Sequence, residues 1–208
     1  KDEKSNQKPD TVVIKKEDPR EKYLTSSYAI AKLNKNQYDK TAIAKAKALT
    51  EEAKVLLKLK KNEEAIVKFE EAFEFATDPD AYYRYGNALS NVMKLEESIK
   101  AYDISIELGY DKEYYAIYNK GCSYSLLKNS EESFKHILLA VDKGYTAIPY
   151  MEKDPDLEYV RSLPEWKAKY KEIKKHAKPI SPTQLKRYIN KKAFIRIEIH
   201  EFMVHDLR

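Results

Sequence analysis

Residues 81–109 read AYYRYGNALSNVMKLEESIKAYDISIELG, and residues 116–144 read AIYNKGCSYSLLKNSEESFKHILLAVDKG. All four glycines of the chain fall at matching positions of these two stretches, 35 residues apart. The glycine pairs and the other residues that match at this offset are Gly86 with Gly121, Gly109 with Gly144, Ala81 with Ala116, Tyr83 with Tyr118, Glu96-Glu97-Ser98 with Glu131-Glu132-Ser133, Lys100 with Lys135, and Tyr110 with Tyr145. A period in this range is typical of stacked supersecondary units rather than of one closed core.

Apolar residues inside and before these stretches recur at the spacing of amphipathic helices, three and four residues apart. The stripes are Ala65, Ile66, Phe69, Ala72, Phe73 and Ala76; Tyr82, Tyr85, Ala88, Leu89 and Val92; Leu95, Ile99, Tyr102 and Ile106; Tyr114, Ile117, Tyr118, Gly121 and Tyr124; and Phe134, Ile137, Leu138 and Val141. We expect helices joined by short polar turns, so that neighbouring helices run antiparallel.

Helix pairs of this kind, with a small residue in each helix, resemble tetratricopeptide repeats, and about three units fit over residues 45–145. The residues that carry the resemblance are Leu49, Ala53, Leu56, Ala65, Phe69 and Ala72 in the first unit; Tyr82, Tyr85-Gly86, Leu89, Ser98, Tyr102 and Ser105 in the second; and Ile117, Lys120-Gly121, Tyr124, Ser133, Ile137 and Ala140 in the third. The resemblance implies an all-α fold, a right-handed superhelical stack of antiparallel helix pairs with flanking capping helices.

The four glycines have two different expected roles. Gly86 and Gly121, with Ala53 in the first unit, would let the two helices of a pair approach closely, although glycine costs about 1 kcal/mol in a helix. Gly109 and Gly144 follow the last apolar residue of their helices, which predicts left-handed residues that end those helices.

The segments that flank the repeats have their own patterns. Residues 1–22 are polar and are expected to form a tether, whereas residues 23–145 are expected to form the repeat domain. Within that domain we expect a capping helix at 23–34 and one long helix at 39–60. Residues 146–178 are expected to form C-terminal capping helices that begin at Asp154-Pro155-Asp156-Leu157 and at Ser162-Leu163-Pro164-Glu165-Trp166, with Pro164 in the first turn and Trp166 as a packing residue.

Residues 179–208 are expected to form a short helix followed by a strand. Ser181-Pro182-Thr183-Gln184 has the form of a capping box, and isoleucines alternate with polar residues between Phe194 and Val204, which is strand spacing. A single strand cannot stand alone. It could pair with residues 11–14, pair with another molecule, or begin a further domain.

Composition excludes several classes of protein. The chain has 208 residues, 42% of them hydrophobic, and a formal net charge of +5. No stretch reaches the ~18 consecutive apolar residues of a membrane span. The one cysteine, Cys122, excludes an intramolecular disulfide and is expected to be a small buried residue. The start at Lys1 and the polar segment after it favour an exported, periplasmic or lipid-anchored bacterial protein; a trimmed cytoplasmic protein is the alternative.

The sequence lacks the usual signatures of catalysis. His200-Glu201 and His205 have the residue types of a zinc motif, but the histidines are five apart in a segment with strand spacing and would lie on opposite faces. No nucleophile with a nearby base, Gly-rich phosphate loop or paired carboxylates are evident. We therefore expect a protein that is not an enzyme and that has no cofactor and no metal.

The resemblance implies that the first helix of each unit lines a concave groove that binds a peptide or a segment of a partner protein. Carried over by position, the groove residues are Lys54, Lys58, Tyr83, Arg84, Asn87, Asn91, Tyr115, Tyr118, Asn119 and Cys122. A clamp for a chaperone's C-terminal carboxylate needs other residue types at the positions of Lys54, Arg84 and Asn119. The sequence thus favours a non-catalytic interaction module with a peptide or protein partner, whose identity stays open.

Two alternatives remain open at this stage. The repeats could serve as a regulatory or accessory domain of a larger enzyme or assembly that continues past Arg208. A basic segment at residues 171–192 could instead bind a polyanion or a membrane surface, although no motif for specific nucleic-acid recognition accompanies it. Its basic residues are Lys171, Lys174, Lys175, Lys178, Lys186, Arg187, Lys191 and Lys192.

Overall fold

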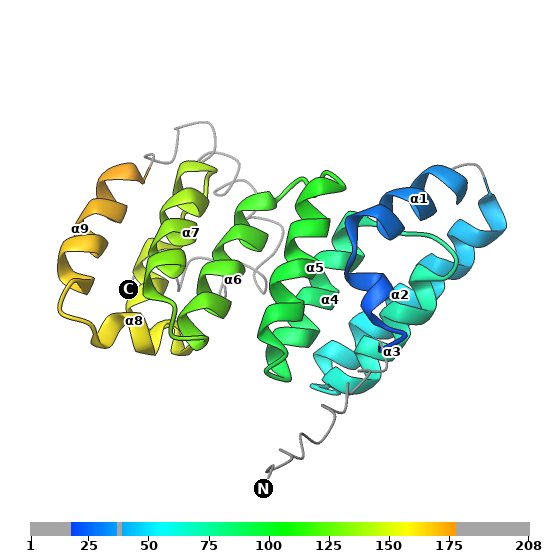
Figure 1. Cartoon of the computed structure of the whole chain (residues 1–208), viewed down its shortest axis with the longest axis horizontal. Helices are drawn as coiled ribbons and strands as arrows, with labels where there is room; N and C mark the ends of the chain where they lie inside the picture. The colour runs from blue at the N-terminus through cyan, green and yellow to red at the C-terminus, as the bar shows by residue number, and fades with distance from the viewer. Residues whose placement is uncertain (1–17, 37–38, 178–208) are drawn as a thin grey trace, which may run out of the picture.

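The computed structural model describes residues 18–36 and 39–177, and in these ranges all regular secondary structure is helical. Figure 1 shows the helices in a row that runs from α1, α2 and α3 at one end to α8 and α9 at the other. In chain order the α-helices and the 3-10 helices (η) are η1 (Glu21–Leu24), α1 (Ser26–Asn36), α2 (Lys40–Lys58), α3 (Asn62–Phe73), α4 (Pro79–Asn91), α5 (Leu95–Glu107), α6 (Glu113–Leu126), α7 (Ser130–Asp142), η2 (Ile148–Glu152), η3 (Pro155–Leu157), α8 (Glu158–Ser162) and α9 (Trp166–His176).

The helices stack as consecutive pairs. α2 packs against α3, α4 against α5, and α6 against α7, while α3–α4 and α5–α6 contacts join one pair to the next. This confirms the prediction of an all-helical fold built from antiparallel pairs. The long helix expected at 39–60 is α2, whose N-terminus is capped by the Asp39 side chain. The short helix and the strand that were expected at 179–208, and most of the expected N-terminal tether, lie outside the described residues.

The turns repeat from pair to pair. Inside each pair the turn contains a residue with positive φ, which is Lys60, Met93 or Lys128 at about 60°. The residue after each of them donates its N–H to a carbonyl five residues back, which closes the end of the preceding helix. Between pairs the positive-φ residues are Gly109 at 87° and Gly144 at 111°, as the sequence predicted.

The other two glycines lie where the helices of a pair cross. A methyl group at Gly86 would lie 2.6 Å from Cε1 of Tyr102, and one at Gly121 would lie 2.9 Å from Cγ1 of Ile137. The backbone N of Ile137 and the carbonyl oxygen of Ser133 would also be only 3.2 Å from a methyl group at Gly121. These contacts confirm the expected close approach.

The core consists of two main clusters. One extends from η1 to α5 and contains Phe73 and Tyr82, whose rings stack at 4.1 Å between centroids. The other extends from α6 to α9. A smaller cluster of Tyr102, Tyr110 and Ala116 lies where α5 meets α6 and links them along the chain.

The N-terminal helix does not simply extend the row of pairs. The helix expected at 23–34 forms as η1 and α1, and it is attached to the end of α3 and the loop after it. Tyr23 donates its hydroxyl to Glu74 at 2.6 Å, Lys22 forms an ion pair with the same carboxylate, and Thr77 donates to the carbonyl of Ala29 at 2.9 Å. Both η1 and α1 also contact α5, so the segment spans the first two pairs.

The segments after α7 occupy the position that a fourth helix pair would take. At the 35-residue offset, α6 and α7 correspond to residues 148–161 and 165–177, and the second range contains α9. In the structure η3 and α8 contact α6, while α9 contacts α7. Pro149 and Pro155 lie in the short 3-10 helices that replace a continuous first helix. Trp166 stacks on Tyr170 at 5.3 Å, which confirms it as a packing residue.

One boundary differs from the prediction. Pro164 was expected in the first turn of the last helix, but α9 begins at Trp166 with Glu165 as its N-cap. The backbone of Leu163 is extended, as the steric demand of a following proline favours, so the helix starts after the proline instead.

We predict that Gly121→Ala destabilises the protein by about 1 to 2 kcal/mol. Backbone atoms of α7 limit how far the helices can adjust, so we expect an overpacking cost of about 2–3 kcal/mol, which exceeds the gain of about 1 kcal/mol in helix propensity. Urea unfolding measures the change. The control is Glu131→Ala at an exposed position of α7, which should change the free energy of unfolding by less than about 0.5 kcal/mol. A Gly121→Ala variant as stable as wild type would contradict the close crossing.

We predict that Glu74→Ala releases the N-terminal segment from the stack. Hydrogen bonds from Lys22 and Tyr23 lower the pKa of Glu74 to about 2. Since this value lies below the ordinary value of 4.5, the stabilisation is present above pH 4.5 and is lost as the pH falls toward 2.

Hydrogen exchange read by mass spectrometry should therefore show faster exchange of residues 21–36 in Glu74→Ala at neutral pH. Wild type should lose the same protection on acidification. Glu71→Ala is the control, because the Glu71 carboxylate on α3 pairs with Lys68 instead. Equal protection of residues 21–36 in the Glu74 and Glu71 variants would overturn this attachment.

Candidate binding site on the face of α2, α4 and α6

The first helices of the three pairs present one continuous face, which we term the first-helix face. Residues spaced three and four apart lie on one side of a helix, and this spacing connects most of the residues predicted for the groove. The residues of the first-helix face are Lys47, Glu51, Lys54 and Lys58 on α2; Asp80, Arg84, Asn87 and Asn91 on α4; and Tyr115, Asn119 and Cys122 on α6.

A compact charge cluster joins α2 to α4. The Asp80 carboxylate accepts a hydrogen bond from Nε of Arg84 at 2.8 Å and lies 3.2 Å from Nζ of Lys54. Lys54 also donates to Glu51 at 3.0 Å. Burial alone would raise the pKa of Asp80, but the hydrogen bonds and charges of Arg84 and Lys54 lower it. The two predicted residues Lys54 and Arg84 thus meet at a carboxylate that was not predicted.

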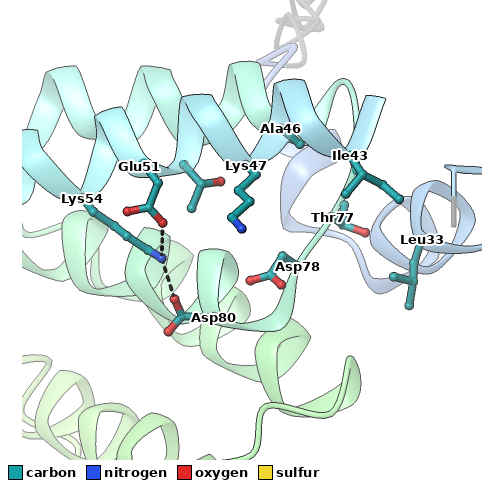
Figure 2. A pocket seen from close by; sticks show the side chains of 11 residues that line it. Leu33, Ile43, Ala46, Lys47, Glu51, Lys54, Thr77, Asp78 and Asp80 are labelled. Carbon is teal, nitrogen blue, oxygen red and sulfur yellow. Dashed lines mark hydrogen bonds and ion pairs between the residues drawn. The ribbon is translucent and has the colours of Figure 1, made fainter. Parts of the chain in front are cut away.

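A pocket of about 550 Å³ opens beside this cluster, between α1, α2 and the start of α4. Figure 2 shows Lys47 extending from α2 toward the segment that carries Asp78. Leu33 and Ile43 lie at one end of the pocket, and the cluster of Glu51, Lys54 and Asp80 lies at the other end. Its lining consists of Leu33, Ile43, Ala46, Lys47, Thr50, Glu51, Lys54, Ala76, Thr77, Asp78 and Asp80. Small side chains leave the space, and Leu33 and Ile43 remain 37% and 41% exposed beside it.

A second, more polar hollow of about 260 Å³ lies farther along the face, between α4 and α6. Oδ1 of Asn87 accepts hydrogen bonds from the Tyr102 hydroxyl and from Nδ2 of Asn119, each at 2.9 Å. The hollow is lined by Asn87, Ser90, Asn91, Tyr102, Asn119, Cys122 and Asp156. Asp156 comes from η3, so the C-terminal segment contributes to the face.

Other predicted residues have more specific places. Asn91 lines the polar hollow and donates to Asn62 at 3.0 Å. Tyr83 stacks on Tyr110 at 4.7 Å, and Tyr115 packs edge-on against Tyr145. Lys58 is exposed near the C-terminal end of α2.

Tyr118 is a core residue, contrary to the expectation that it lines the groove. It is 3% exposed, its ring stacks on Tyr145 at 4.1 Å, and its hydroxyl donates to Asp154 at 2.6 Å. The reason is that the loop and 3-10 helices after α7 fold back onto α6. Cys122 is buried as well, and burial raises the pKa of its thiol well above the ordinary value, as expected for an inert buried residue.

Cys122, Asp154 and Asp156 bring potential metal-ligand atoms within 4.8 Å of one another. The Asp154 carboxylate, however, already accepts from the Tyr118 hydroxyl and from the backbone N–H of Asp156 at 3.0 Å. These bonds give Asp154 a structural role, in which it fastens η3 to α6.

Part of the predicted basic segment lies on α9. Lys171, Lys174 and Lys175 are exposed there, and Nζ of Lys174 lies 4.6 Å from the centre of the Tyr170 ring. The remaining basic residues lie outside the described ranges: Lys178, Lys186, Arg187, Lys191 and Lys192.

The sequence matches no protein-family model and no curated protein. Within residues 18–36 and 39–177, no helix combines the length and apolar character that crossing a membrane requires. The described residues thus define a protein of stacked helix pairs, and its candidate binding surface is the first-helix face.

We predict that Asn87→Ala destabilises the fold by about 1–3 kcal/mol, because it removes the acceptor of the buried Tyr102 hydroxyl. Asn91→Ala is the matched control. Asn91 is exposed and, within the described part of the chain, its side chain bonds only to Asn62, so the change should cost less than about 0.5 kcal/mol. Urea unfolding of both variants measures the difference. Equal stability would show that the Asn87 amide does not organise the hollow.

Proposed function

We propose that this chain is a non-catalytic interaction module of the tetratricopeptide type, whose first-helix face binds an extended segment of a partner protein. One observation carries the proposal. The pocket beside Lys47 and the polar hollow at Asn119 are both lined by residues of the first-helix face, and the charge cluster at Asp80 forms part of the wall of the first pocket. A single extended segment that crosses this face can place side chains in both.

The chemistry of the face suits a peptide. The side chains of Asn87, Asn91 and Asn119 offer both donors and acceptors, which can pair with backbone amide groups whatever the partner's sequence. The larger pocket is partly apolar and can take a hydrophobic side chain, which supplies affinity by burying apolar surface. Backbone recognition and side-chain anchoring are thus available side by side.

The tetratricopeptide assignment rests on the repeat itself. The 35-residue offset relates Gly86 to Gly121 at the helix crossings and Gly109 to Gly144 between pairs, and both roles recur in the structure. A right-handed superhelical course of the pairs is part of the proposal, because it would make the first-helix face concave and able to enclose a segment.

The proposal predicts that an Arg84→Ala, Asn119→Ala double variant loses partner binding. Asn87 stays unchanged in this variant, because its amide holds the Tyr102 hydroxyl and its removal would confuse loss of binding with loss of stability. The measurement is affinity capture from native extract, with quantitative mass spectrometry of the captured proteins.

The matched control is Lys68→Ala with Lys135→Ala, which also removes two side chains that form ion pairs but lie outside both pockets. A protein captured by wild type and by the control should be recovered about tenfold less by the Arg84→Ala, Asn119→Ala variant. A tenfold loss corresponds to a loss of about 1.4 kcal/mol in binding free energy. Equal recovery by all three proteins would exclude the first-helix face as the binding site.

A further inference from the structure

This inference rests on the proposed function and concerns the charge that a bound segment would carry. The centre of the first-helix face is neutralised internally, since Lys54 and Arg84 are matched by Glu51 and Asp80. A bound segment would gain little from placing a charge there, because each central charge already has a partner.

Each of the two pockets holds a charge that forms no ion pair among the described residues, and the two charges have opposite sign. At the first pocket this charge is that of Lys47, which Glu51 attracts only from beyond ion-pair distance. Figure 2 shows its side chain extending into the pocket mouth. Asp78, across the mouth, is already engaged because its carboxylate accepts the N–H of Ala81 at 2.9 Å and caps α4.

At the polar hollow the unmatched charge is that of Asp156. Its side chain has no cationic partner among the described residues, and it shares the hollow with amides and hydroxyls that can accept or donate hydrogen bonds. Burial and the neighbouring Asp154 carboxylate raise the pKa of Asp156. A cation placed in the hollow would stabilise the ionised Asp156 carboxylate, which would offset both effects, and it would therefore be favoured there.

We propose that the first-helix face selects a segment of mixed charge. An acidic residue next to an apolar one would lie at Lys47, with the apolar side chain in the larger pocket against Leu33 and Ile43. A lysine or arginine would lie at Asp156. The two positions are separated by the spacing from α2 through α4 to α6, about 20 Å for helix axes 8–10 Å apart, which corresponds to about six extended residues.

The probe is a phage-displayed library of random 12-residue peptides, selected on the full 208-residue chain. Wild type should enrich peptides with an acidic and an apolar residue side by side and a basic residue about six positions away. The order of the acidic and basic residues along the enriched peptides shows in which direction a peptide crosses the first-helix face.

A Lys47→Glu, Asp156→Lys double variant should enrich the same pattern with the two charges exchanged. The best wild-type peptide, measured by fluorescence anisotropy, should bind Lys47→Glu about tenfold more weakly, and the charge-exchanged peptide should recover binding to the double variant. If the double variant does not fold, as judged by its circular dichroism melt, Lys47→Glu and the conservative Asp156→Asn provide the same comparison one charge at a time.

Lys167→Glu is the control, because Lys167 is exposed on α9 and lines neither the pocket nor the hollow. It should change affinity less than about threefold. Enrichment without charge preference, or an effect of Lys167→Glu as large as that of Lys47→Glu, would overturn the mixed-charge inference and leave the proposed function standing. Failure of wild type to enrich any peptide over the Arg84→Ala, Asn119→Ala variant would overturn both.

Discussion

The structure depends on the absence of a side chain at Gly86 and Gly121. At Gly86 the ring of Tyr102 occupies the space that a Cβ atom would need, so α5 crosses α4 at close range. This crossing brings the Tyr102 hydroxyl to Asn87, and Asn87 in turn fixes Asn119 on the next pair. A packing constraint between the two helices of one pair thus determines the geometry of polar groups on the face that α4 and α6 share.

Most of the fold follows from the sequence because it is periodic. The apolar spacing gives the helices, and the glycine offset gives the register of the pairs. The positive φ at Lys60, Met93 and Lys128 could not be predicted, because residue types that seldom adopt it give no signal in the sequence. A left-handed residue there is required by the tight turn within each pair, whichever side chain it carries.

The candidate site was predictable only where it is part of the repeat. Lys54, Arg84, Asn87 and Asn119 lie on the expected face. Tyr118 does not, because Asp154 reaches it from a segment in which the helical pattern has already ended. Lys47 was not predicted, for a related reason. Its pocket forms because α1 lies beside α2, and the placement of α1 depends on Glu74 at the end of α3 rather than on a local sequence pattern.

The way η1 and α1 lie across the stack has a consequence for cooperativity. In a linear array each pair touches only its neighbours, so stability is a sum of local terms and unfolding can stop at any junction. Here η1 and α1 contact both the end of α3 and α5, which ties the first two pairs into one unit. The boundary between the two large clusters, where Tyr102, Tyr110 and Ala116 pack together, then separates two cooperative units, and the molecule should open there as two foldons rather than pair by pair.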